Sequence, residues 1–185
     1  MVDDAEALAT QEYQVTAFDI SPTAIAWCRE RFPNTTVNYW SFDYFKKYTT
    51  SRVLFFWQGA TYSVKIHLVK TPMNYCVADV LDLPTAWQGQ FDLVFECRTI
   101  QALPLSHRSQ VITAIISTVK PSGLLWVVTR LRADNSVPED GPPWPVSPQE
   151  LSQLQALNFQ ERERHHFPES KTPEIQQAAI LFGRL

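Results

Sequence analysis

The amino-acid sequence predicts an α/β fold in which a mostly parallel sheet is flanked by helices. Apolar runs that each end on a carboxylate occupy residues 15–19, 75–79 and 91–96. A helix-spaced apolar pattern follows the first of these runs, and another lies at 106–119. Strand and helix patterns that alternate in this way are typical of a parallel sheet with crossover helices.

Length and composition favour one globular domain that binds a small molecule. A chain of 185 residues with 45% hydrophobic residues can bury a sizeable core. The net charge of -3 provides no basic face of the kind that nucleic-acid binding needs. No apolar run approaches the roughly 20 residues of a membrane span, and the acidic start does not resemble a signal peptide. Three cysteines without paired spacing suit a reduced compartment, so we expect a cytoplasmic protein.

The first elements of the sheet surround one acidic residue. A helix is predicted at 3–10, where acidic residues occupy the first turn, and a strand at 15–19. The next helix begins at Ser21, a good N-cap followed by Pro22, and runs to about residue 31. Asp19 therefore lies at the carboxyl end of a strand, where open α/β sheets bind their ligands.

Residues 40–75 interrupt this alternation. Their composition shifts to basic and aromatic residues, and the dipeptide Asn-Tyr occurs at both edges, at 38–39 and 74–75. Joining the two edges produces one strand that ends on Asp79, so we predict a single domain over 1–185 with a dispensable inserted segment at 40–75. Within it, 53–57 and 62–69 are predicted to form a hairpin. The alternative is an ordinary hairpin subdomain with a chance repeat.

The second half of the chain returns to alternating elements and then ends on a strand pair. The two last strands have no helix between them, which predicts an antiparallel edge. A proline-rich loop at 132–146 has a length typical of functional loops. The elements predicted here are a strand at 91–96, a helix at 106–119, a strand at 124–131, a helix at 147–157, and strands at 159–167 and 178–183.

Three acidic residues mark the candidate site at the carboxyl edge of the sheet. Asp19 is placed to accept hydrogen bonds from both ribose hydroxyls of a nucleoside. Asp79 is placed to accept from an adenine amino group while the Val80 amide meets the ring, and Glu96 would face the reacting group. Each carboxylate alone is more often a helix cap or part of a solvated turn, but three in register favour a nucleoside site.

The motifs of the chain follow one another in the order of a known family. They are Phe18-Asp19-Ile20-Ser21-Pro22-Thr23-Ala24-Ile25, Ala78-Asp79-Val80-Leu81-Asp82-Leu83-Pro84, Phe91-Asp92-Leu93-Val94-Phe95-Glu96, Leu103-Pro104 with Arg108, and Lys120-Pro121-Ser122-Gly123-Leu124-Leu125. This series resembles the class I S-adenosylmethionine-dependent methyltransferases. Residues 99–104 and 141–145 are similar to small bacterial members related to thiopurine methyltransferase, which act on small, soft nucleophiles. The resemblance implies a Rossmann-like fold and S-adenosylmethionine as the cofactor.

The resemblance also implies roles for individual residues. In-line methyl transfer depends on alignment and desolvation more than on acid–base chemistry. Glu96 and Trp144 are the predicted catalytic residues, with Phe95 and Thr99 beside them and Arg130 or Arg132 available to an anionic substrate. The alternative is that Trp144 only anchors its loop and that both arginines are solvated. The predicted cofactor-binding residues are Asp19, Ile20, Asp79, Val80 and Glu96.

No metal is predicted. His165 and His166 are adjacent in a predicted strand and would point to opposite faces.

The chain departs from the family pattern at its start. Members open with a strand and a glycine-rich loop, and here Met1-Val2-Asp3-Asp4 begins where that loop has already ended. Only glycine permits such a close approach of the backbone to a ligand. We therefore predict a sheet truncated at its first strand, weak cofactor binding, and self-association through the unpaired edge.

Three functions follow from these observations. The first is methyl transfer from S-adenosylmethionine to a small soft nucleophile of thiol-like character. The second is a degenerate, non-catalytic methyltransferase remnant or interaction module, which the absent loop and the aromatic, basic segment favour. The third is a nicotinamide-dependent oxidoreductase on the same type of sheet, which the absent phosphate-binding glycines disfavour.

Overall fold

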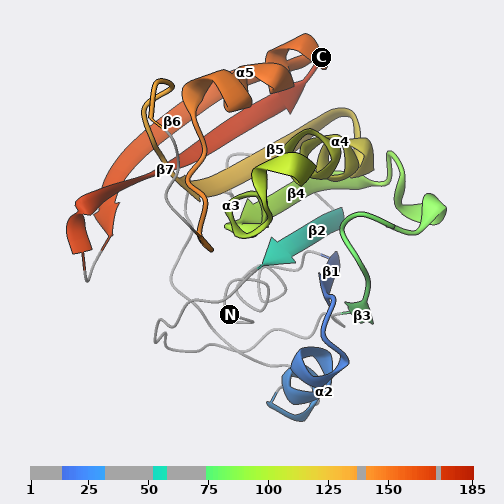
Figure 1. The fold of residues 1–185 in the computed structure, drawn as a ribbon. Coiled ribbons are helices and arrows are strands. Elements are labelled where there is room, and N and C mark those ends of the chain that lie inside the picture. Colours follow the sequence, from blue (N-terminus) through green and yellow to red (C-terminus); the bar gives the residue numbers. More distant parts are fainter. Residues whose placement is uncertain (1–13, 32–51, 58–73, 137–140, 170–171) are drawn as a thin grey trace.

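A single twisted sheet organises the computed structural model, which describes residues 14–31, 52–57, 74–136, 141–169 and 172–185 (Figure 1). Its strand order is β3-β1-β2-β4-β5-β7-β6. The strands are β1 (Gln14–Asp19), β2 (Arg52–Trp57), β3 (Asn74–Val77), β4 (Phe91–Cys97), β5 (Val119–Arg130), β6 (Phe159–Glu169) and β7 (Thr172–Arg184). The α-helices are α2 (Pro22–Arg31), α3 (Thr99–Ala102), α4 (Arg108–Thr118) and α5 (Pro148–Ala156), and η2 (Thr85–Trp87) and η3 (Leu105–His107) are short 3-10 turns.

The pairing pattern confirms the predicted α/β class. The strands from β3 through β5 run parallel to one another, whereas β7 pairs antiparallel with both β5 and β6. The C-terminal strand pair is therefore the antiparallel edge that the sequence predicts. The predicted helix at 3–10 and the strand at 62–69 lie outside the described residues.

The strand β2 corrects the prediction that the sheet lacks a strand beside β1. It pairs in parallel with β1 on one side, where Phe56 is in register with Phe18, and with β4 on the other, where Phe56 is in register with Glu96. A strand from within residues 40–75 thus occupies the middle of the sheet, so the gap from which self-association was predicted is absent. Residues 53–57 form the predicted strand, but their described neighbours are parallel strands from elsewhere in the chain.

One face of the sheet carries most of the described core. Figure 1 shows α3, α4 and α5 on the same side of β4, β5 and β7. Buried residues of α4 such as Ile112 and Ile115 pack with Val94, Val127 and other apolar side chains of these strands. Helix α5 begins as predicted, because Ser147 and Glu150 form a reciprocal capping box in which each side chain accepts from the other's backbone N–H.

The start of β5 differs from the prediction. The strand begins at Val119 rather than at 124, and its pairing with β4 shifts register between Phe91 and Leu93. Ser122 adopts a left-handed backbone conformation with φ of 60°, which residues other than glycine rarely adopt. A Cβ on Gly123 would lie 2.8 Å from the Lys120 carbonyl oxygen, so glycine is required at that position. None of the helices in the described residues is long and apolar enough to cross a membrane.

Candidate functional site

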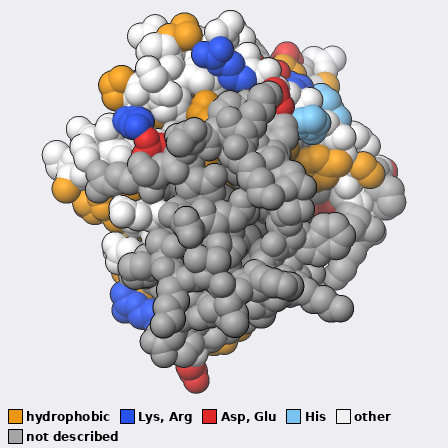
Figure 2. Space-filling view, turned by 180° about the vertical axis from the view of Figure 1, so that it is seen from behind, with side chains coloured by type: hydrophobic (Ala, Val, Ile, Leu, Met, Phe, Trp, Pro, Cys, Tyr) orange, Lys and Arg blue, Asp and Glu red, His pale blue; other side chains and the backbone are white. Residues whose placement is uncertain are grey.

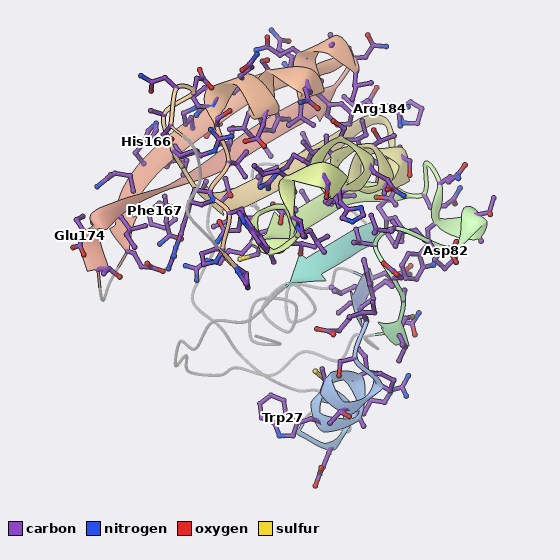
Figure 3. The ribbon with its side chains drawn as sticks, in the orientation of Figure 1. Trp27, Asp82, His166, Phe167, Glu174 and Arg184 are labelled. Carbon is purple, nitrogen blue, oxygen red and sulfur yellow. The ribbon has the colours of Figure 1, made fainter. Side chains whose placement is uncertain are left out.

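The carboxyl ends of β1 and β3 bring two of the predicted acids together. Asp19 is in register with Val77, and the Ala78 N–H donates to the Asp19 carbonyl oxygen at 3.1 Å. Asp79 is the next residue along the chain, and Asp82, labelled in Figure 3, closes the turn behind it by donating its N–H to the Asp79 carbonyl oxygen. The two strand ends therefore lie side by side at one edge of the sheet.

Each of these carboxylates stabilises its own turn through one oxygen. Oδ1 of Asp19 accepts from the Ser21 N–H at 2.7 Å, and Oδ1 of Asp79 accepts from the Leu81 N–H at 2.8 Å. Ser21 in turn accepts from the Ala24 N–H, as expected of the N-cap of α2. The described part of the chain offers no hydrogen-bond partner to the second oxygen of either carboxylate, which leaves both oxygens available to a ligand.

An exposed apolar side chain lies beside these acids. Ile20, the residue directly after β1, is 60% exposed, whereas Val80 is only 9% exposed. A large aliphatic side chain next to a carboxylate suits a nucleoside, which has an apolar base and hydroxyl groups on its sugar. The predicted cofactor-binding residues Asp19, Ile20, Asp79 and Val80 thus belong to one end of the sheet.

Glu96 has no exposed surface. Its Oε1 accepts from the Thr99 N–H at 2.5 Å and the Ile100 N–H at 3.0 Å, so the side chain caps α3. Burial raises the pKa of Glu96 to about 8, although the two backbone N–H groups and Arg108 favour its charged form. Oε2 is buried without a hydrogen-bond partner. The structure therefore places Glu96 behind α3, within the carboxyl edge rather than on its surface.

Arg108 ties the proline-rich loop to α3. This buried guanidinium donates through Nη1 to the Ile100 carbonyl oxygen and through Nη2 to the Trp144 carbonyl oxygen at 2.9 Å. Its Nε lies 3.1 Å from Oε1 of Glu150, so Arg108 forms an ion pair with the first turn of α5. Trp144 is half-buried, and its N–H donates to the Gln101 carbonyl oxygen at 2.6 Å. The loop that carries Trp144 is therefore held over α3 by several hydrogen bonds.

The two arginines suggested for an anionic substrate both have protein partners. Arg132 donates to Glu150 at 3.0 Å and to the Pro145 carbonyl oxygen at 3.0 Å. Arg130 donates to Glu169 at 2.6 Å. The alternative that both are merely solvated is therefore wrong. The sequence did not indicate a role for Glu169, because no local pattern connects it to Arg130, which lies 39 residues earlier in the chain.

A profile described as "Thiopurine S-methyltransferase (TPMT)" matches residues 2–181. The chain belongs to this family. No curated protein sequence matches the chain significantly. The thiopurine methyltransferase family uses S-adenosylmethionine, which confirms the cofactor that the sequence motifs imply.

Solved structures share the fold at low sequence identity. A SAM-dependent methyltransferase from Methanosarcina mazei has 14% identity and a TM-score of 0.64, with 96% of this chain and 85% of that chain covered. The N-methyltransferase NodS from Bradyrhizobium japonicum WM9, in complex with S-adenosyl-l-homocysteine, has 14% identity, a TM-score of 0.55, and coverage of 97% and 82%. A 1,6-didemethyltoxoflavin-N1-methyltransferase from Burkholderia thailandensis has 12% identity, a TM-score of 0.52, and coverage of 98% and 76%.

The residues present fit the nucleoside part of this cofactor. Two carboxylates with available oxygens and an exposed aliphatic side chain lie at neighbouring strand ends, which matches the donors and the apolar base of a nucleoside. The described residues contain no group of three or more side chains that could hold a metal. Histidine side chains lie at the molecular surface in Figure 2, and His165 and His166 face Ala179 and Ala178 in the β6–β7 register.

Proposed function

We propose that this family member transfers the methyl group of S-adenosylmethionine to a small, soft, thiol-like nucleophile. The observation that carries the proposal is the division of the carboxyl edge into two halves. Asp19 and Asp79 lie at the β1 and β3 ends, while α3 and the Trp144 loop are clamped together beyond β4 and β5. Open α/β sheets bind ligands outside the carboxyl ends of their strands, so we assign one reactant to each half.

In this proposal the first half holds the nucleoside. The second oxygens of Asp19 and Asp79 accept from the ribose and the base, Ile20 covers an apolar face of the ligand, and the Val80 backbone meets the ring. When bound, the cofactor supplies a methyl group on a positively charged sulfonium. The chain's own contribution is to orient the two reactants and exclude water, since displacement at such a methyl group needs alignment more than proton transfer.

The second half holds the acceptor. Trp144 supplies a large half-buried side chain from a loop with little freedom, since Arg108 and Gln101 both bond its backbone. Glu96 acts on this half through α3, because it accepts hydrogen bonds from the first two N–H groups of that helix. The competing hypothesis is a degenerate methyltransferase remnant that binds no cofactor, and the tests below distinguish the two.

The nucleoside site is tested by Asp19→Asn. The amide retains an oxygen for the Ser21 N–H but lacks the charge, and we expect the affinity for S-adenosylhomocysteine to fall by about 1–3 kcal/mol. Isothermal titration calorimetry measures this change. The matched control is Ser21→Ala, which removes the cap of α2 and leaves the carboxylate in place, and its affinity should remain near that of the wild type.

Equal affinity in the wild type and Asp19→Asn would contradict the ribose assignment. No heat with the wild-type chain at high ligand concentration would support the remnant instead. Methyl transfer is tested separately with radiolabelled S-adenosylmethionine and small thiols, selenols and amines as acceptors. Transfer to thiols or selenols well above transfer to amines is the expected result, and a preference for amines would overturn the soft nucleophile.

A further inference from the structure

Four arginines near the carboxyl ends of β4 and β5 share only two carboxylates among the described residues. Arg108 and Arg132 contact Glu150, and Arg98 and Arg130 contact Glu169. The two groups differ in how the guanidiniums are otherwise satisfied. Arg108 and Arg132 also donate to backbone carbonyl oxygens, at Ile100, Trp144, Pro145, Ala133 and Ser136.

Within the described part of the chain, the guanidiniums of Arg98 and Arg130 donate to no backbone carbonyl oxygen. Nη2 of Arg98 donates to the neutral Gln177 Oε1 at 2.7 Å and lies 3.7 Å from the Glu169 carboxylate. Arg130 donates to Glu169 at 2.6 Å, and its Nε is buried with no hydrogen-bond partner. The Nε of Arg108 also makes no hydrogen bond, but it lies 3.1 Å from the Glu150 carboxylate. The side chains of Arg98, Arg130 and Glu169 are 13%, 22% and 9% exposed, respectively. This mostly buried group has one surplus positive charge and an unsatisfied donor, and a further anion would satisfy both.

The position of this group indicates which of the two reactants it would bind. Arg98 directly follows β4 with a left-handed φ of 67°, and its N–H donates to the Val128 carbonyl oxygen in β5 at 2.9 Å. Arg130 ends β5, and its backbone N–H donates to Gln101 of α3. Glu169 reaches the same place from the end of β6, in the hairpin whose arms are marked by Phe167 and Glu174 in Figure 3. The group therefore belongs to the acceptor half of the edge.

We propose that Arg98 and Arg130 bind a carboxylate on the methyl acceptor, and that Glu169 is the internal counterion with which this carboxylate competes. The proposal rests on the proposed function, because it places the acceptor beside β4 and β5. Two guanidiniums form charge-assisted hydrogen bonds with a carboxylate in fixed geometry, whereas a neutral amide of the same shape forms only weaker ones. Glu169 stays ionised at neutral pH, since hydrogen bonding by Arg130 lowers its pKa.

The test compares two thiols of nearly equal shape, 3-mercaptopropionate and 3-mercaptopropionamide. Their binding to the full chain is measured by calorimetry at pH 7, with and without saturating S-adenosylhomocysteine. We expect the carboxylate to bind about 10- to 100-fold more tightly than the amide. Arg130→Gln and Arg98→Gln should each remove most of this ratio. The control Arg164→Gln, which breaks an ion pair with Glu161 on β6, should preserve it.

Glu169→Gln distinguishes a binding role from a structural one. If Glu169 only stabilised the arginines, its loss would weaken binding of both probes or leave both unchanged. A competing counterion predicts the opposite, namely severalfold tighter binding of 3-mercaptopropionate with no gain for the amide. This variant and Arg130→Lys keep the proposal testable if Arg130→Gln fails to fold, which thermal unfolding will reveal.

Three results would overturn the proposal. The first is equal binding of the two thiols by the wild type, or no binding of either. The second is a ratio that survives both arginine substitutions. The third is loss of S-adenosylhomocysteine affinity in Arg98→Gln and Arg130→Gln, which would assign the anion to the cofactor's own carboxylate. A carboxylate preference without methyl transfer would retain the site and remove the proposed reaction.

Discussion

Deletion of residues 40–75, with Tyr39 joined to Cys76, is expected to abolish cooperative unfolding. The deletion removes β2, which pairs with β1 on one side and β4 on the other. It also replaces Asn74-Tyr75 of β3 with the identical dipeptide at 38–39. Without it, β1 and β3 lose their connection to the rest of the sheet, and buried backbone groups on β1 and β4 lose their hydrogen-bond partners. Thermal and urea unfolding monitored by circular dichroism measure the effect.

A single substitution tests the same point without shortening the chain. Leu54 lies in the middle of β2, in register with Thr16 and Val94. Because β2 has a neighbour on each side, the Leu54 N–H faces a ladder partner, and Leu54→Pro should lower the free energy of unfolding by roughly 3 kcal/mol. The control Leu54→Val keeps the N–H and should cost far less.

A deletion variant as stable as the wild type would contradict both expectations. It would mean that β1 can pair directly with β4 and that 40–75 is an insertion, as the repeated Asn-Tyr dipeptide suggests. Because the sheet in the structure already contains β2 at that position, we expect the opposite result.

Glu96→Gln is expected to change how stability depends on pH. Burial raises the pKa of Glu96 to about 8, from about 4.5 in the unfolded chain. Between these values the folded protein keeps a proton that the unfolded chain has released. The wild-type free energy of unfolding should therefore fall as pH rises from 4.5 to 8, by an amount on the order of 4 kcal/mol.

The glutamine variant should lack this fall. Its amide oxygen can still accept from the Thr99 and Ile100 N–H groups, but it carries no charge at any pH. Urea unfolding at pH 5, 7 and 8.5 measures the difference, and Glu96→Gln should be the more stable protein at the highest pH. The control Glu161→Gln removes a surface carboxylate whose pKa is lowered by Arg164, and it should leave the fall in place.

Parallel profiles for the wild type and Glu96→Gln would contradict the buried, protonated carboxyl group. The same pair of proteins also informs on function. If Glu96 acts only through α3, the glutamine variant should retain affinity for S-adenosylhomocysteine, whereas Glu96→Ala should lose both the cap and stability.

Local sequence patterns determined the fold class and the position of two site residues. A strand pattern that ends on an acid and continues into an N-cap places Asp19 at a carboxyl end. Because parallel strands share that edge, Asp79 had to lie on the same side of the sheet. The first prediction depends only on residues close in sequence, and the second only on the direction of the strands. The structure shows β1 and β3 paired in parallel, as both require.

Only the tertiary structure decided which strands are neighbours and which charges meet. The pattern at 53–57 identifies a strand but not its partners, since any apolar strand can fill the gap between β1 and β4. The role of Glu96 depends on burial by α3, an element too short to produce a periodic signal. Arg98 and Glu169 are brought together by the β6–β7 hairpin, and no local pattern relates charges that are 71 residues apart, because their contact depends on how the whole sheet is ordered.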